Sequence, residues 1–383
     1  MINFNEKIVF KKFLSDNTYF FLLCAISLSL IVWIIQAVNF LDFISEDGHS
    51  FDIYFYFTAL NYPKIFKNIL PFIFFISLFY TISKYEDKNE LKIFWINGVN
   101  KIKFSNVLIK YTFLFFIFQI FLSSLLSPVL QDKARSFLKT SNMDFFPSLM
   151  QEKKFIDTVD KLTIFIQNKN SSEEFENIFL KDDLSNNKSQ IIYAKKGFLK
   201  DVNGVRKLIL FDGKFLNTDE KKTTVFNFSQ TEFDLTNYVT KSITHPKVQE
   251  LTTFLLLRCN YSFYVEKKLT RFFNFRDANI LCNENFVREI NQELFDRLIK
   301  PLYLFLISVI ACFLLTRYKE THKYKLHKIY IFGLGIVTII FSEMSVNYAG
   351  KSLNNTIVFY ILPLLLTLIA YLTLRSKLIY KKK

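Results

Sequence analysis

The side chains that most often carry catalysis or metal binding are few in this chain and lie far apart. The 383 residues include four histidines, of which only His322 and His327 are close enough to share a metal ion. Both fall in a basic loop, where we expect solvent to surround them. Residues 350–352 resemble the end of a phosphate-binding loop, but Ser345 stands where that motif needs its first glycine. The sequence thus predicts no catalytic residue, metal or cofactor here, and any ATP must bind a separate subunit.

The four cysteines are too few and too scattered for a disulfide scaffold or a structural zinc site. Cys24 and Cys312 lie inside apolar runs, which predicts small core residues. Cys259 and Cys282 lie in a more polar region, and the sequence leaves open whether they form a disulfide.

One acidic residue, Glu343, lies inside an otherwise apolar run. An acid within a membrane is costly and usually faces a bundle interior or a cavity. Two roles remain open for it: a gate or subunit contact, or a structural hydrogen bond.

The composition places these residues in a membrane protein. Hydrophobic residues make up 51% of the chain and aromatic residues 18%. They gather in runs of about 20 residues, the length that crosses a bilayer as a helix. The formal net charge is +15, but the basic residues flank the apolar runs instead of alternating with aromatics on one face, which argues against nucleic-acid binding.

Six runs are predicted to be transmembrane helices. The first run is too long for a signal-peptide core and has no cleavage site after it. The predicted spans are 19–40, 68–83 with an upstream extension towards residue 53, 111–131, 301–316, 328–348 and 352–374.

The distribution of Lys and Arg predicts the orientation of the spans. The 40–52 loop carries four acids and no Lys or Arg, whereas the 317–328 loop and the C-terminal tail are strongly basic. Both termini and the 84–110 and 317–328 loops are therefore predicted to be cytoplasmic. The large 131–297 insertion follows three spans and is expected on the opposite side.

The insertion is predicted to be all-β. Leu162, Ile164 and Ile166 alternate with other residues, and similar short runs recur about every 12 residues. The Asn203-Gly204 and Asp212-Gly213 pairs are expected to form turns between strands. This pattern favours an antiparallel sandwich, roll or jelly-roll. Further predicted strands are 177–180, 190–194, 205–211 and 224–228.

After the strands, residues 284–300 show helical periodicity and lead into the fourth span. The face of this helix is formed by Phe286, Ile290, Leu294 and Leu298. We therefore expect three parts: residues 1–130 with helices one to three, 131–297 with the β-domain and helical return, and 298–383 with helices four to six.

A short amphipathic helix is predicted at about 87–98 in the cytoplasmic loop after the second span. Glu90 leads it, and Gly98 stands where a C-cap belongs. The helix could lie on lipid, or it could insert into a groove of a cytoplasmic partner where Glu90 pairs with an arginine. Its apolar stripe is Leu91, Phe94, Trp95 and Val99.

Several short motifs follow one another along the predicted spans. They are Leu70-Pro71, Asn89-Glu-Leu-x6-Gly98, Pro128, and Glu293-Leu-x2-Arg-x3-Pro301. Their order and sidedness resemble the LptF/LptG lipopolysaccharide-export permease family over nearly the whole chain. Asn89, where serine is common, and the bulky residues 93–97 depart from the family pattern. Segments 163–167 and 191–197 resemble the F-type subunit more than the G-type.

The resemblance implies a permease subunit of an ABC-type exporter in the bacterial inner membrane, without an ATPase site of its own. The inserted β-domain would be periplasmic and jelly-roll-like, and it would add a strand to a neighbouring jelly-roll. The implied partners are a second LptF/LptG-type permease, a cytoplasmic LptB-type ATPase dimer that binds ATP, LptC/LptA-type periplasmic β-jelly-roll proteins, and lipopolysaccharide.

The resemblance also implies roles for particular residues. Lys64 and Lys67, after Pro63 at the outer end of the second span, are candidates for binding lipopolysaccharide phosphates, although both could simply extend to lipid headgroups. Coupling to the ATPase is implied for Glu90, Leu91, Phe94, Trp95 and Gly98.

Three other classes of membrane protein fit the sequence less well. A membrane-bound transferase of envelope synthesis would need convergent acids, histidines or a metal site at the outer surface, which the sequence lacks. A four-span mechanotransmission permease is disfavoured by the two additional spans. A non-transporting sensor is the remaining alternative.

Overall fold

The computed structural model describes most of the chain, and only these residues are discussed below. They are 4–41, 51–137, 152–159, 162–170, 174–184, 188–202, 205–219, 222–234, 247–261, 263, 271–275, 278–281, 284–350 and 353–380.

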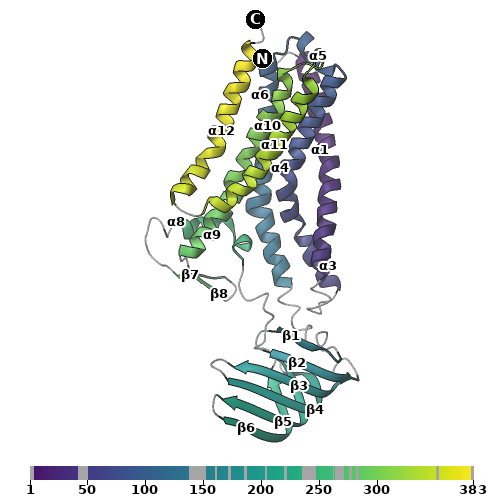
Figure 1. Ribbon diagram of the computed structural model, residues 1–383, viewed down its shortest axis with the longest axis vertical. Helices are drawn as coiled ribbons and strands as arrows, with labels where there is room; N and C mark the ends of the chain where they lie inside the picture. The colour runs from purple at the N-terminus through teal and green to yellow at the C-terminus, as the bar shows by residue number, and fades with distance from the viewer. Residues whose placement is uncertain are drawn as a thin grey trace. The chain divides into compact units, whose positions relative to one another are not determined.

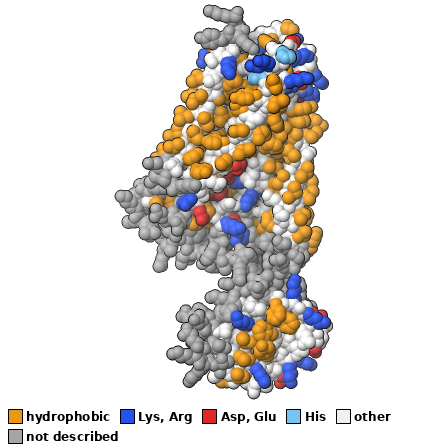
Figure 2. All heavy atoms as spheres, in the orientation of Figure 1, with side chains coloured by type: hydrophobic (Ala, Val, Ile, Leu, Met, Phe, Trp, Pro, Cys, Tyr) orange, Lys and Arg blue, Asp and Glu red, His pale blue; other side chains and the backbone are white. Residues whose placement is uncertain are grey.

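Six helices in this part of the chain are long and apolar enough to cross a membrane, which confirms the predicted number. The first three come before the β-rich region and the last three after it (Figure 1). Hydrophobic side chains cover their exposed surface, whereas Lys and Arg gather at the end near α5 (Figure 2). The six are Lys7–Asn39, Phe51–Asp87, Lys101–Phe137, Phe286–Thr316, Tyr324–Tyr348 and Asn355–Ile379.

Short π and 3-10 turns, labelled η, interrupt the third and fourth spans, and one more precedes α8. The helices are α1 Phe4–Asn39, α3 Phe51–Leu60, α4 Tyr62–Asp87, α5 Glu90–Ile96, α6 Lys101–Phe121, α8 Thr253–Tyr261, α9 Glu284–Leu294, α10 Tyr303–Cys312, α11 Tyr324–Tyr348 and α12 Leu353–Tyr380. The π turns are η1 Leu122–Leu126 and η4 Phe295–Ile299, and the 3-10 turns are η2 Val248–Glu250, η5 Lys300–Leu302 and η6 Phe313–Thr316.

The chain divides into two compact units. The first contains residues 1–34, 61–132 and 247–383, and the second contains 35–60 and 133–246. Residues 247–297, which the sequence grouped with the β-domain, therefore fold together with the helices of the first unit.

The second and fourth spans form the centre of the first unit. Of the most apolar window, 72% is buried in the fourth span and only 11% in the sixth. Phe74, Phe75 and Ile307 are completely buried in this core. The outer spans consequently present apolar side chains to their surroundings, as helices in lipid do.

The second unit contains a six-stranded antiparallel sheet in which each strand pairs with its neighbour in sequence. This confirms the predicted all-β insertion and adds β1, which the sequence did not predict. Away from this sheet, β7 Arg271–Phe275 and β8 Ala278–Leu281 pair in the first unit. The strands of the large sheet are β1 Phe155–Val159, β2 Leu162–Lys169, β3 Glu174–Leu184, β4 Lys188–Val202, β5 Val205–Asp219 and β6 Lys222–Asp234.

Burial alternates along β2 as predicted, with Leu162, Ile164 and Ile166 in the core of the sheet. Val202 of β4 pairs with Val205 of β5. The predicted turn residues between them, 203 and 204, lie outside the described residues.

The predicted turn at Asp212-Gly213 is wrong, because β5 continues through both residues. Asp212 does have a positive φ of 49°. Gly213 is needed for a different reason: a Cβ there would overlap the Phe228 ring and the Tyr193 carbonyl oxygen on the two neighbouring strands. Glycine within a strand often marks such a close approach.

Candidate functional site

Four charged side chains form a continuous series of ion pairs near the ends of α4 and α11 that lie away from α5. Lys67 Nζ lies 2.7 Å from Asp296 Oδ2, and Lys300 Nζ lies 2.8 Å from Asp296 Oδ1. Lys300 Nζ is also 2.8 Å from Glu343 Oε1. We call Lys67, Asp296, Lys300 and Glu343 the four-charge chain. Its two positive and two negative groups alternate, so its formal charge is zero.

The four-charge chain joins three spans and is mostly shielded from solvent. Lys67 and Lys300 are buried, whereas the Glu343 side chain is about half exposed. Charges within a membrane are tolerated when they pair with one another. Removal of one buried partner is strongly destabilising, because it leaves the other charge uncompensated.

These contacts separate the two lysines that the sequence had grouped. Lys67 is neutralised by Asp296, and its backbone carbonyl accepts a hydrogen bond from Gln119. Lys64 is half-buried and donates a 2.8 Å hydrogen bond to Gln249 Oε1, but it forms no ion pair within the described part of the chain. Of the two, only Lys67 is in an ion pair with a described residue.

Arg297 is the largest completely buried side chain among the described residues. Its Nε donates to Glu293 Oε1 at 2.7 Å. Its two terminal nitrogens donate to the Leu251 and Gln249 carbonyls at 2.8 and 3.0 Å, and one of them also donates to Thr253 Oγ1 at 3.0 Å. The planar guanidinium presents several donors in a fixed geometry, which suits it to fasten one segment to another. Arg297 thereby fixes residues 249–253 to the fourth span.

The π turns η1 and η4 meet through a hydrogen bond that follows from Pro301. In a regular helix the Arg297 carbonyl would accept the backbone N–H of residue 301, but proline has none. Ser123 Oγ of η1 donates to that carbonyl instead, at 2.9 Å. The adjacent Ser124 carbonyl accepts a 2.6 Å hydrogen bond from Thr253 Oγ1. The Glu293, Arg297 and Pro301 pattern is thus a packing motif that joins the third and fourth spans.

Asp296, Arg297 and Lys300 have no predicted role, because the apolar run of the fourth span begins only at Pro301. The structure begins this span at Phe286. A signal was present: Asp296 and Lys300 are four residues apart, so they share a helical face that leads into the apolar run. Their distant partners, however, cannot be read from local spacing.

The apolar stripe of α5 packs inside this chain. Leu91, Phe94 and Val99 are each at most 3% exposed. The Phe94 ring contacts Phe10 and Phe104 with centroid distances of 5.3 and 5.1 Å. These residues seat α5 against the spans.

Trp95 is half-buried and belongs to the same packing. Its ring lies edge-on to Phe104 at 5.9 Å, and Lys101 Nζ lies 5.6 Å from the ring centroid. Trp95 therefore reports on how α5 is seated.

The end of α5 confirms the predicted glycine cap. Gly98 has a φ of 79°, and its N–H donates to the Trp95 carbonyl at 3.1 Å. The Val99 N–H donates to the Phe94 carbonyl at 2.9 Å. These two bonds form a Schellman motif, which requires a left-handed residue at the glycine position.

The outward surface of α5 carries Glu90, Ile93 and Ile96. Ile93 is 49% exposed and Ile96 is 84% exposed. Glu90 is half-buried and makes no ion pair or side-chain hydrogen bond with the described residues. We call these three residues the outer α5 face. It combines a carboxylate with two exposed apolar side chains.

Residues of the loop after the fourth span contact α5 and the start of α6. Lys92 on α5 pairs with Glu320 at 3.0 Å, and both side chains are more than half exposed. The Lys101 ammonium lies 3.9 Å from the centroid of the Tyr318 ring. A hydrogen bond from its own backbone N–H, followed by the bond from Lys92, holds the pKa of Glu320 below its ordinary value.

The described residues contain no group of three His, Cys, Asp or Glu side chains that could hold a metal ion. Cys24 and Cys312 are free thiols. Cys259 is disulfide-bonded, and Cys282 lies outside the described residues.

The comparison with protein families gives one match that covers nearly the whole chain. Residues 12–377 match the family described as "Lipopolysaccharide export system permease LptF/LptG". The chain is also similar to the uncharacterized protein RP871 of Rickettsia prowazekii (strain Madrid E). The two are 22% identical over 346 residues, which cover 90% of this chain and 92% of that protein.

Proposed function

The chain belongs to the LptF/LptG family of lipopolysaccharide export permeases, and from this membership we propose that it is one of two permease subunits driven by a separate cytoplasmic ATPase. The observation that carries the coupling part of this proposal is the outer α5 face. Its Glu90 carboxylate has no ionic partner among the described residues, and Ile93 and Ile96 are exposed beside it.

We propose that the outer α5 face binds the ATPase, while the buried stripe only seats the helix. An amphipathic helix docks into a groove through a few apolar anchors. A carboxylate among them would form a charge-assisted pair with an arginine of the partner. A helix seated by Leu91, Phe94 and a Schellman cap moves as one body with α4 and α6, so force on it reaches the spans.

Copurification from a mild detergent tests this docking. Glu90→Ala and Ile96→Asp should each lose the ATPase while the second permease stays bound. Lys92→Gln is the matched control, because it changes a neighbouring exposed charge whose pair with Glu320 is local. If both outer-face variants retain the ATPase at the native level, α5 is not the docking element.

The proposed topology has both termini and α5 in the cytoplasm and the β-domain in the periplasm. It is supported by the gathering of Lys and Arg at the α5 end of the helices (Figure 2). In this orientation Lys64, near the start of α4, lies in the periplasmic half of its span.

We propose that Lys64 contacts a phosphate of lipopolysaccharide and that Lys67 does not. The support is that Asp296 neutralises Lys67, whereas Lys64 donates a hydrogen bond to the neutral Gln249 and forms no ion pair with the described residues. A photo-crosslinker at position 64 should capture lipopolysaccharide, and one at the exposed Asn68 on the same helix serves as the control. Equal capture at both positions would show contact with bulk lipid.

For the β-domain we propose strand addition to an LptC/LptA-type jelly-roll partner. The edges of the six-stranded sheet are β1 and β6, and Val225 and Phe226 on β6 are each 56% exposed. Edge strands carry backbone groups that can pair with another chain. Segments 163–167 and 191–197 of β2 and β4 support assignment to the F-type subunit. Cysteine crosslinking along β1 and β6 to the bridge proteins would identify the paired edge, and no crosslink at either edge would contradict strand addition.

A further inference from the structure

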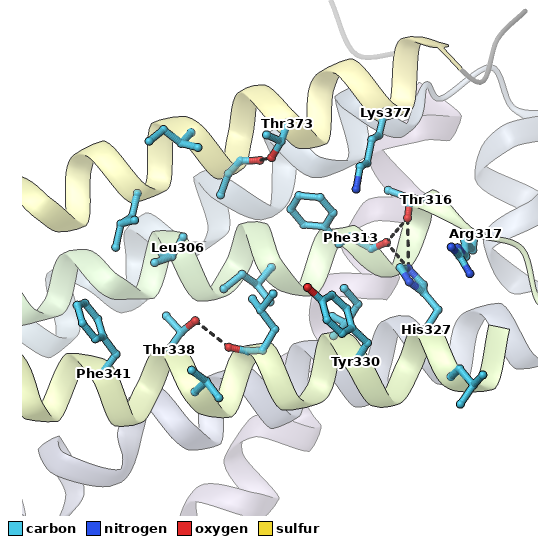
Figure 3. Close-up of a pocket in the computed structure, with 18 of the residues that line it drawn as sticks. Leu306, Phe313, Thr316, Arg317, His327, Tyr330, Thr338, Phe341, Thr373 and Lys377 are labelled. Atoms are coloured by element: carbon cyan, nitrogen blue, oxygen red, sulfur yellow. Dashed lines mark hydrogen bonds between the residues drawn. The ribbon is translucent and has the colours of Figure 1, made fainter. Parts of the chain in front are cut away.

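A groove lies between α10, α11 and α12, apart from both the four-charge chain and the outer α5 face. Its volume is about 1110 Å³. Both α11 and α12 pack on α10, which forms the floor of the groove. Figure 3 shows Leu306 and Phe341 at one end and Arg317, His327 and Lys377 at the other. The groove therefore has an apolar body and a basic head.

The body is lined by aliphatic side chains from all three helices. They include Leu306, Ile310, Leu334, Val337, Leu366 and Ile369. All lie within spans that cross the membrane, so the body of the groove is at the depth of the lipid hydrocarbon. A ligand that fills this part must be apolar and elongated.

The head carries cations without nearby acids. Arg317, Lys323 and Lys377 line it, and the groove has no Asp or Glu among its described lining residues. Within the described part of the chain none of these three cations forms an ion pair. Lys377 Nζ instead lies 5.6 Å from the centroid of the Phe313 ring.

The rest of the head is built from fixed polar groups. His327 Nε2 lies 3.0 Å from the Phe313 carbonyl oxygen and 3.2 Å from Thr316 Oγ1. These contacts hold the imidazole beside the cations (Figure 3). The sequence predicted a solvated His327, but it is half-buried at this site.

We propose that this groove binds one anionic glycerophospholipid from the leaflet at the α5 end. Its acyl chains lie between α11 and α12, and its phosphate meets Arg317, Lys323 and Lys377. The three cations of the head favour an anionic ligand. The aliphatic lining of the body, which lies within the transmembrane spans, favours a lipid over a polypeptide. Basic pockets between membrane helices bind anionic headgroups in this way. The site is independent of which lipid the permease exports.

Lipid titration of the purified full-length complex by native mass spectrometry tests the site. The probes are phosphatidylglycerol and phosphatidylcholine with identical acyl chains. We expect preferential binding of phosphatidylglycerol, and Lys323→Gln/Lys377→Gln should weaken it roughly 30-fold, the effect of two headgroup cations. The matched control is Lys325→Gln/Arg375→Gln, which removes two exposed cations that lie two residues away from Lys323 and Lys377 but do not line the groove.

A second pair of variants tests the body of the groove. Ala370→Trp places a large side chain in it and should abolish phosphatidylglycerol binding. Leu368→Trp on the same helix is exposed, lies outside the lining, and should leave binding unchanged. Should Ala370→Trp fail to fold, the exposed charge variants still decide the question.

Four outcomes would overturn the proposal. One is an equal loss of binding in the groove and control charge variants, which would mean unspecific surface attraction. A second is equal affinity for phosphatidylcholine. A third is displacement of phosphatidylglycerol by equimolar lipid A, which would make this a site for the exported lipid. The last is the lack of any binding in the complex, as expected if a partner subunit fills the groove.

Discussion

The two ends of the helical unit differ in how their charged side chains are compensated: one end contains a buried series of ion pairs, whereas the α5 end has exposed pairs such as Lys92–Glu320 beside charges that have no partner among the described residues. At the end away from α5, Lys67, Asp296, Lys300 and Glu343 neutralise one another, and Arg297 pairs with Glu293. At the α5 end Glu90 has no ionic partner among the described residues. The groove cations there are likewise without acids.

This difference suggests a criterion for separating charged residues that stabilise a membrane protein from those that bind a ligand or a partner. A buried charge that is already paired adds to the fold, and its removal costs stability. A charge that the chain leaves unpaired near its surface is available to a ligand or a partner. By this criterion Lys67 belongs to the fold, and the proposed binding roles fall to Lys64 and Glu90, which form no ion pair with the described residues.

Among substitutions at the end away from α5, Arg297→Ala is expected to lower the stability most. It removes a completely buried cation and leaves Glu293 and two carbonyls without their donor. We expect the free energy of unfolding to fall by about 5 kcal/mol, the upper part of the range for one-sided loss of a buried pair. Thermal unfolding in detergent measures this loss.

The control for that variant is Arg288→Ala, which removes an exposed arginine from the same segment. Arg297→Lys should recover only part of the stability, because an ammonium cannot reproduce the planar donor geometry. Equal melting temperatures for Arg297→Ala and Arg288→Ala would show that the buried contacts of Arg297 do not stabilise the helical unit.

A smaller loss is expected from Asp296→Asn, which leaves Lys67 without a countercharge. We expect a cost of about 3 kcal/mol, the lower part of the same range. Addition of Lys67→Met should restore most of it, since Lys300 and Glu343 remain as a balanced pair.

The double variant sharpens the comparison because it separates charge balance from hydrogen bonding. Unfolding of the wild type, both single variants and the double variant gives the coupling energy of the two positions. A double variant no more stable than Asp296→Asn would mean that neutrality of the four-charge chain is not what matters.

The smallest expected effect concerns the exposed Lys92 and Glu320 pair at the α5 end. The pKa of Glu320 is lowered in the folded protein, so its stabilising contribution is present above the ordinary carboxyl value of 4.5. The contribution is lost as pH falls through the lowered folded value. Glu320→Gln should therefore differ slightly from the wild type at neutral pH, and the difference should vanish in acid.

Trp95 fluorescence can follow this effect, because the chain has two tryptophans and Trp33→Phe leaves Trp95 as the sole emitter. The seating of α5 is compared in wild type, Glu320→Gln and Lys92→Gln on this background. A difference that persists after Glu320 is protonated would assign the effect to something other than the ion pair.

The sequence was sufficient for features that local pattern determines. Runs of apolar residues predicted the six spans, and the alternation around Ile164 predicted a strand. The family motifs located α5 and its Gly98 cap. In each case the signal lies within one element.

The sequence was insufficient where a residue's role depends on a distant partner. Periodicity identified the α5 stripe but not that Phe94 packs against Phe10 of its own chain. Asp212-Gly213 has the composition of a turn, yet Gly213 serves the approach of Phe228. Asp296 and Lys300 look like polar residues before a span, since their partners Lys67 and Glu343 lie far away in sequence.

The distance along the chain between Lys67 and Asp296 has a consequence for biosynthesis. The two residues are separated by 229 positions, which a ribosome takes roughly 10–45 s to translate. The second span therefore enters the membrane with an uncompensated lysine long before its countercharge is made. Because Lys67 lies near the end of α4, its flexible stem can reach the headgroup region during that interval. Asp296 arrives with the fourth span and Glu343 with the fifth, so the four-charge chain can be completed only after five of the six spans have been made.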